Sequence, residues 1–189
     1  MIKIGILGDI GSGKSYVAKN FGYPVFNADA EVGKLYKKDR KIFDKLNKCL
    51  PKYIYTFPIK KNEVSSAILV NKSNLKKIVK IVHLEIRNKM NIFLAKNKNR
   101  KIVILDIPLL LENKINKKND ILVFVKSKKA DVIKRLRKRE NFNLELLGKF
   151  KSIQLPLDYK ENKSQFVVKN NFTKKSVKVG IKKILKEIL

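Results

Sequence analysis

The sequence predicts an α/β fold in which helices flank both faces of a mostly parallel sheet. Short apolar runs of strand length alternate along the chain with longer segments whose apolar residues recur every three or four positions. The first run, residues 3–7, ends in a glycine-rich turn, as a buried parallel strand does before its helix. Strands that are separated by helices in this way join most simply into a parallel sheet.

Each element follows from its local pattern. We expect strands at residues 3–7, 23–26, 101–107, 121–125 and 166–168. We expect helices at residues 15–20, 130–138 and 175–189, and further helices within 30–50 and 62–98 on either side of a break at 51–58. The helical stretch between the second and third strands is longer than a simple crossover needs, so it predicts a helical insertion next to the sheet.

Composition excludes several classes of protein. Cys49 is the single cysteine, so no disulfide forms within the chain, and no Cys/His set has zinc-ligand spacing. Hydrophobic residues make up 44% of the chain, which is too many for a disordered protein. No apolar run approaches the roughly 18 residues of a membrane span. We therefore expect a soluble cytoplasmic protein with no membrane partner.

The charge is unusually positive. Lysine and arginine number 45 against 16 aspartates and glutamates, which gives a formal net charge of +29. Such an excess suits a polyanion or a phosphorylated small molecule. It also suits compositional drift, because lysine, asparagine and isoleucine are all abundant and the lysines are spread along the chain. The charge alone does not decide the function.

The segment Gly8–Ser15, Gly-Asp-Ile-Gly-Ser-Gly-Lys-Ser, fits the phosphate-binding pattern G-x-x-x-x-G-K-[ST] at every fixed position. It follows an expected strand and opens an expected helix, which is the context the pattern requires. Glycines let backbone N–H groups turn inward around phosphates, and the start of the helix adds its positive end. Lys14 would reach the β- and γ-phosphates, and the Ser15 hydroxyl would hold Mg²⁺. The motif predicts a P-loop protein that binds a nucleoside triphosphate with Mg²⁺.

Two aspartates follow expected strands. Asp29 lies just after the second one, where a carboxylate can accept the proton of an attacking hydroxyl or orient a metal; it suits equally well the N-cap of a helix from Ala30. Asp106 lies at the end of the strand 101–107, which favours a Walker-B-like carboxylate near Mg²⁺, with a plain strand terminator as the alternative. His83, the only histidine, lies in an expected helix, where a structural role is the commoner one.

A basic helix is expected at residues 130–138. Arginines on a mobile lid can neutralise the charge that develops during phosphoryl transfer. Arg135 and Arg139 are four residues apart, so we expect them on one helix face and directed at the same phosphates, with Arg137 directed elsewhere. A solvated basic face is the alternative in a chain this rich in lysine.

Taken in order, these residues resemble the dephospho-coenzyme A kinase family. The resemblance spans almost the whole chain, and its most specific part is Leu105–Glu112, which is similar to the family's Asp-(apolar)-Pro-Leu-Leu-Phe-Glu stretch. The other landmarks are Phe26-Asn27-Ala28-Asp29, His83, Lys134-Arg135, Arg139, Gln154 and Val167–Asn171.

The resemblance implies a P-loop NTPase-type core at about 1–29, 101–127 and 164–189, a helical substrate-binding region at about 30–100 and a helical lid at about 128–163. It implies that ATP phosphorylates the 3′-hydroxyl of dephospho-coenzyme A, with Asp29 as the base and Lys14, Arg135 and Arg139 around the transferred group. The implied metal ligands are Ser15 and Asp106. The implied nucleotide contacts are Gly8, Ile10, Gly11, Ser12, Gly13, Lys14, Ser15, Tyr16 and Asn170. The implied acceptor contacts are Asp29, His83, Arg87, Pro108, Leu109, Leu110 and Glu112.

The chain departs from the family pattern at several positions. Asp9 and Tyr16 replace a usual glycine and threonine of the P-loop, and Asn27 replaces an aspartate. Leu157 and Lys160 stand where arginines are expected, Gln165 and Lys169 stand where acids are expected, and an arginine expected near Asn62 is absent. A P-loop kinase of nucleoside or nucleotide type with a diverged acceptor site therefore stays open, and so, with less support, does a nucleic-acid-binding ATPase.

Overall fold

The computed structural model describes residues 1–140 and 142–189, which divide between two compact units. Unit 1 contains residues 1–27, 154–189 and the described part of 96–142. Unit 2 contains residues 28–95 and 143–153. The predicted lid, residues 128–163, is thus shared between the two units, and its action as a lid stays a prediction.

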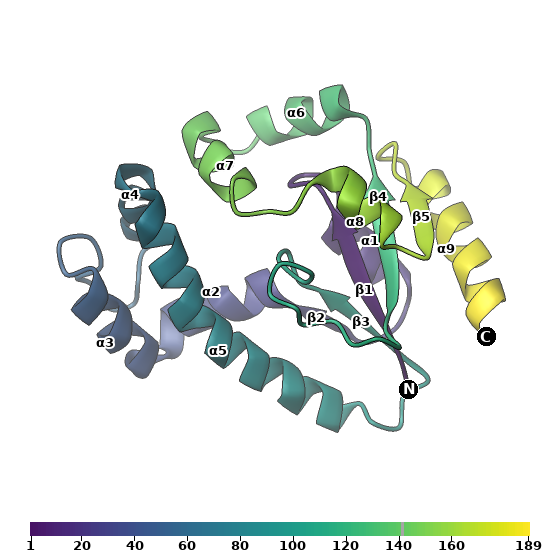
Figure 1. The fold of residues 1–189 in the computed structure, drawn as a ribbon, viewed down its shortest axis with the longest axis horizontal. Helices are drawn as coiled ribbons and strands as arrows, with labels where there is room; N and C mark the ends of the chain where they lie inside the picture. The colour runs from purple at the N-terminus through teal and green to yellow at the C-terminus, as the bar shows by residue number, and fades with distance from the viewer. Residues whose placement is uncertain (141) are drawn as a thin grey trace. The chain divides into compact units, whose positions relative to one another are not determined.

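Unit 1 is built on a parallel five-stranded sheet, as the sequence predicts. Its order is β2-β3-β1-β4-β5 (Figure 1). The strands are β1 (Ile2–Gly8), β2 (Val25–Asn27), β3 (Ile102–Asp106), β4 (Ile121–Lys126) and β5 (Phe166–Lys169). Strand β1 is central, and its last five residues are buried, so the turn that follows it starts from a fixed point.

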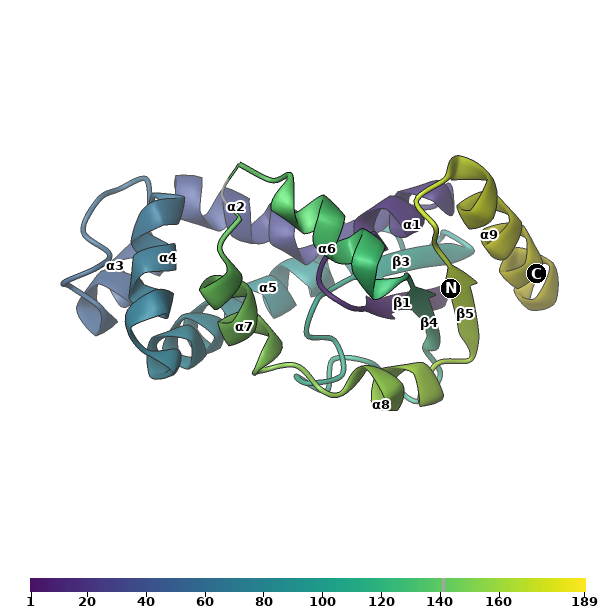
Figure 2. The same ribbon diagram turned by 90° about the horizontal axis from the view of Figure 1, so that it is seen from above.

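Helices cover both faces of this sheet. The unit 1 helices are α1 (Lys14–Asn20), α6 (Lys129–Arg137), α8 (Leu157–Asn162) and α9 (Lys174–Ile188). Figure 2 shows α1 and α9 on one face and α8 on the other. The core between the sheet and α1 and α9 is aliphatic, with Ile4, Ile6 and Val123 from the strands against Val17 and Ile181 from the helices.

Unit 2 is helical throughout its described elements. They are α2 (Ala28–Lys38), α3 (Arg40–Cys49), α4 (Lys61–Val70), α5 (Lys72–Lys96, whose last residue belongs to unit 1) and α7 (Leu144–Lys151). Helix α7 joins the unit by packing against α4, where the ammonium of Lys149 donates to the carbonyl oxygen of Leu69 at 2.5 Å. Among the described residues, no helix combines the length and the apolar character that crossing a membrane requires.

Two short helices, α7 and α8, lie within the region 128–163 that the sequence predicts as a helical lid, but they had no ranges of their own among the predicted helices. Helix α7 has eight residues and α8 has six, so the periodic pattern of each in the sequence is short. Helix α7 has no buried residue, and α8 buries only Lys160. Strand β2 also begins two residues later than predicted, after Pro24, whose ring nitrogen carries no hydrogen to donate to a neighbouring strand.

Candidate active site

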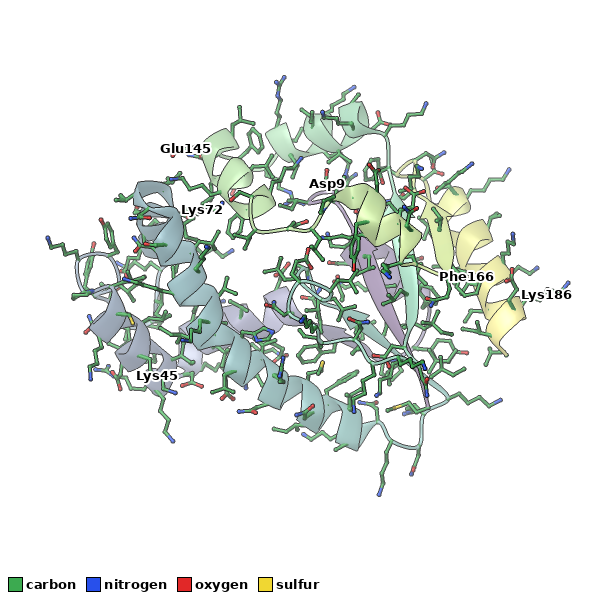
Figure 3. All side chains as sticks on the ribbon, viewed as in Figure 1. Asp9, Lys45, Lys72, Glu145, Phe166 and Lys186 are labelled. Carbon is green, nitrogen blue, oxygen red and sulfur yellow. The ribbon has the colours of Figure 1, made fainter. Side chains whose placement is uncertain are left out.

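The P-loop occupies the turn between β1 and α1, at the carboxyl edge of the sheet, where Figure 3 shows Asp9. Gly11 and Gly13 have φ angles of 84° and 90°, a conformation that glycine adopts without strain. Gly13 is the N-cap residue of α1, and no side chain caps the helix there. The first backbone N–H groups of α1 are therefore not occupied by a side-chain cap, as a phosphate cradle requires.

Glycine is also required at these positions by close packing. A Cβ at Gly11 would lie 2.9 Å from Cγ of Leu136 on α6, and a Cβ at Gly13 would lie 2.4 Å from Nδ2 of Asn170. Both distances are too short for real atoms. The loop is thus closely packed against α6 at Gly11 and against the segment after β5 at Gly13.

Lys14 lies across the loop that contains it. Its ammonium donates to the carbonyl oxygens of Gly8 at 3.2 Å and Asp9 at 2.9 Å. The carboxylate of Asp9 accepts the N–H of Ile10 at 2.7 Å, so the residue that replaces the family's glycine shapes the turn through its own side chain. These contacts hold the Lys14 ammonium at the loop, where the sequence places the β- and γ-phosphates.

Asn27 and Asp106 meet at the ends of β2 and β3, where they are directly paired in the sheet register. The amide nitrogen of Asn27 lies 2.5 Å from Oδ2 of Asp106 and 3.4 Å from the hydroxyl of Ser15. Asp106 is 3% exposed, so its carboxylate is held in one orientation beside the start of α1. A hydroxyl and a carboxylate are hard oxygen donors of the kind that Mg²⁺ takes, so the predicted metal residues fit the ion.

This edge offers few protein ligands. Within the described part of the chain, no group of three or more His, Cys, Asp or Glu side chains is placed to hold a metal. Mg²⁺ that is bound with ATP usually takes one or two protein ligands and fills its other positions with phosphate oxygens and water. Ser15 and Asp106 suit that kind of site.

Asn170, predicted as a nucleotide contact, is 2% exposed and turned toward the protein. Its amide nitrogen donates to the carbonyl oxygen of Ser12 at 2.8 Å, and its side-chain oxygen accepts the N–H of Phe172 at 2.9 Å. Asn170 therefore supports the P-loop through the carbonyl oxygen of Ser12, and its contact with a nucleotide stays a prediction.

Asp29 lies in unit 2, in the first turn of α2. Because α2 begins at Ala28, Asp29 is not an N-cap, and the structural alternative from the sequence is wrong. Its side chain is exposed, and only one residue separates it from Asn27. A carboxylate in a first turn is stabilised by the helix dipole in its ionised form, which is the form a base requires.

His83 and Arg87 lie one turn apart on α5, in unit 2. Burial lowers the pKa of the His83 imidazole below its usual value of 6.5, and the positive charge of Arg87 lowers that pKa further. Nε2 of His83 is buried and has no hydrogen-bond partner among the described residues. His83 is therefore neutral at pH 7, which suits a hydrogen-bonding role toward a ligand rather than a charged one.

We expect the single histidine signal of this protein to titrate below pH 6.5 in an NMR titration. Arg87→Met should raise the pKa part of the way toward 6.5, since the larger cause, burial, remains. Because the unfolded chain takes up this proton first as pH falls below about 6.5, His83 lowers stability on the acid side. A His83 pKa at or above 6.5 in the native protein would contradict this account.

The basic helix α6 ends at Arg137, so Arg139 lies beyond it and does not share a helix face with Arg135. The prediction that the two arginines are directed together by helical spacing is therefore wrong. The backbone N–H of Arg139 still donates to the carbonyl oxygen of Leu136, in a turn that closes the helix. Arg135 instead stacks on Phe172, with its guanidinium carbon 4.3 Å from the ring centroid. Phe172 is not among the site residues predicted from the sequence.

The turn Pro108–Glu112 contains two residues that the sequence assigned to the acceptor but that the structure buries. Leu110 is completely buried and packs over Gly5, so it anchors the turn. The Glu112 carboxylate accepts the N–H of Leu155 at 3.0 Å and pairs with the ammonium of Lys160 at 2.6 Å. The other carboxylate oxygen of Glu112, Oε2, is buried and has no hydrogen-bond partner among the described residues. Contact of Leu110 and Glu112 with an acceptor stays a prediction, and Pro108 and Leu109 are partly exposed.

Comparison with known proteins decides the family. A family model described as dephospho-CoA kinase matches residues 2–176. The chain belongs to the dephospho-CoA kinase family. A dephospho-CoA kinase of Wolbachia sp. subsp. Brugia malayi is 36% identical over 96% of this chain and 95% of its own length. One from Rickettsia conorii is 29% identical over 100% and 98% of the two chains.

Several solved structures have the same fold as this chain. A Thermus thermophilus protein aligns with a TM-score of 0.79 at 24% identity, covering 100% of this chain and 98% of its own. A dephospho-CoA kinase from Campylobacter jejuni aligns with a TM-score of 0.61 at 21% identity, over 98% and 96% of the chains. A shikimate kinase from Bacteroides thetaiotaomicron aligns with a TM-score of 0.52 at 12% identity, covering 98% of this chain and 97% of its own. The P-loop kinase fold predicted from the sequence is thereby confirmed.

Proposed function

We propose that this protein transfers the γ-phosphoryl group of ATP to the 3′-hydroxyl of dephospho-CoA and so forms CoA. The observation that carries the proposal is the match of the dephospho-CoA kinase family over residues 2–176, which includes both the P-loop and the turn after β3. ATP and dephospho-CoA are the substrates that this membership supports.

The P-loop residues bind the phosphates of ATP in this proposal. Backbone N–H groups from Gly11 to Ser15 surround the phosphates, and the Lys14 ammonium exchanges its carbonyl partners on Gly8 and Asp9 for phosphate oxygens. A positive charge fixed at the loop stabilises the negative charge on the transferred group without further reorganisation. Arg135 and Arg139 add positive charge from α6 and the turn after it.

Ser15 and Asp106 hold Mg²⁺ in this proposal, and the ion supplies neutralisation of the phosphate charge. Asn27 donates from one nitrogen to both residues, so it keeps the hydroxyl and the carboxylate turned toward the same point. An aspartate at position 27 would accept rather than donate. This chain therefore orients Asp106 with an amide where the family pattern has a second acid.

Asp29 is the base in this proposal. Its ionised carboxylate accepts the proton of the acceptor 3′-hydroxyl as the oxygen attacks the γ-phosphorus. Asp29 is two positions from Asn27, and two extended residues span at most about 7 Å, so the chain itself ties the base to the metal-binding edge. In this proposal the acceptor contacts neutral His83 and the partly exposed Pro108 and Leu109.

The test measures ADP release from ATP and Mg²⁺ with and without dephospho-CoA. We expect turnover that depends on the acceptor and is lost in Lys14→Met, whose side chain cannot stabilise the phosphoryl group. A nucleoside, a nucleotide and shikimate serve as alternative acceptors, and an RNA oligomer serves as the test for a nucleic-acid-stimulated ATPase. Turnover with any of these but none with dephospho-CoA would overturn the proposal.

A cytoplasmic location stays a prediction that rests on the single cysteine.

A further inference from the structure

We propose that Phe172 is a positioning residue for Arg135: its ring holds the Arg135 guanidinium beside the P-loop for contact with bound ATP. The inference rests on the proposed use of ATP but not on the identity of the acceptor. The role follows from where the ring and backbone of Phe172 lie in unit 1.

The first observation is the stack itself. The guanidinium carbon of Arg135 lies 4.3 Å from the centroid of the Phe172 ring, within the range of an attractive cation–π contact. Arg135 is exposed and long, so without the ring it would sample many rotamers. The contact selects the rotamers in which the guanidinium covers Phe172.

The second observation is that both partners are fixed to the P-loop. Helix α6 carries Arg135 and presses Leu136 and Val132 against Gly11, where a Cβ would lie within 3.1 Å of both side chains. The Phe172 ring reaches Gly13, where a Cβ would lie 3.6 Å from its Cε1 atom. The Phe172 ring therefore lies next to Gly13, and the helix that carries Arg135 packs on Gly11.

The third observation is backbone strain at Phe172. Its φ angle is +64°, in the left-handed region that bulky residues rarely adopt. The conformation is imposed by Asn170, whose side-chain oxygen accepts the Phe172 N–H while its amide nitrogen holds the carbonyl of Ser12. Glycine would adopt this conformation more easily, so the position favours glycine for stability. An aromatic ring at a position whose backbone favours glycine points to a role beyond packing.

Strain and stacking make opposite predictions for two variants, and this separates positioning from structure. Phe172→Leu loses the ring and keeps the strain, whereas Phe172→Gly loses the ring and relieves the strain. If Phe172 were purely structural, the ATP affinities of the two variants would rank in the same order as their melting temperatures. If Phe172 positions Arg135, the two variants have different melting temperatures but bind ATP equally weakly.

The experiment measures the Kd of ATP with Mg²⁺ by calorimetry in the absence of acceptor, together with melting temperatures. We expect Phe172→Leu and Phe172→Gly to weaken ATP binding by the same factor, roughly three- to ten-fold. Phe172→Gly should melt above Phe172→Leu. Phe172→Tyr retains an aromatic face and should bind ATP as the wild type does. Arg135→Ala should weaken binding, and adding Phe172→Leu to it should weaken binding no further.

Phe166→Leu is the matched control, because Phe166 is a half-buried aromatic residue of β5 (Figure 3) that packs against the core of the sheet. It should lower the melting temperature and leave ATP affinity unchanged. Wild-type ATP affinity in both Phe172→Leu and Phe172→Gly would overturn the inference. It would also be overturned if the double variant Arg135→Ala and Phe172→Leu weakened ATP binding by the product of the two single effects. Because no acceptor is present, these results stand even if dephospho-CoA proves not to be the substrate; a wild-type protein that binds no ATP would overturn both proposals.

Discussion

Replacing Lys160 with methionine is expected to destabilise the protein by about 3–5 kcal/mol, the usual cost of removing one partner of a buried ion pair. The side chain of Lys160 is 1% exposed and that of Glu112 is 9% exposed. The ammonium donates to Gln154 as well as pairing with Glu112. Without it, the Glu112 carboxylate stays buried with the N–H of Leu155 as its one remaining partner among those the structure gives.

Urea unfolding measures this cost, and two further variants define it. Lys126→Met removes the same charge from an exposed pair with Glu161, whose side chains are 55% and 27% exposed, and should cost about 0–1 kcal/mol. Lys160→Met combined with Glu112→Gln removes both charges and should recover much of the stability. Equal costs for Lys160→Met and Lys126→Met would refute the buried pair.

The second large effect is on catalysis. Asp29→Asn is expected to lower kcat by about 10²- to 10⁴-fold, the usual contribution of a positioned general base, while ATP affinity stays near that of the wild type. The amide cannot accept the proton of the 3′-hydroxyl. Asp29 is exposed in the first turn of α2, so the exchange should leave folding nearly unchanged.

Single-turnover rates with dephospho-CoA measure the chemical step directly. Asp44→Asn is the matched control in the same unit, because Asp44 is an exposed aspartate that pairs with Arg40 on α3. It should turn over at the wild-type rate. An Asp29→Asn rate within a few-fold of the wild type would show that Asp29 is not the base.

The P-loop and its surroundings could be predicted because the pattern is local. Glycines at fixed spacing, a preceding apolar strand and a following helix all lie within one short stretch of sequence. Asp106 was predictable for a related reason, since the last residue of a buried strand comes to the carboxyl edge of a parallel sheet. Its pairing with Asn27 follows from the sheet register, which the sequence does not reveal.

What the sequence missed depends on contacts between distant segments. Lys160 and Glu112 are both charged, and charged residues of these types are almost never fully buried unless they are paired. Only the fold brings α8 to the turn after β3. Arg139 was misplaced because the helix ends at Arg137, and helix ends are the least certain part of a sequence prediction. Phe172 follows two asparagines with no periodic pattern around it, so its position on Arg135 could be found only in the structure.

The most direct test of the proposed function is to identify the product. Purified protein is incubated with ATP, Mg²⁺ and dephospho-CoA, and the acceptor is analysed by mass spectrometry and by NMR of its ribose. The account predicts that the acceptor gains one phosphoryl group at the 3′-oxygen and becomes CoA, in step with ADP release. Dephospho-CoA recovered unchanged, or phosphorylated at another position, would contradict it.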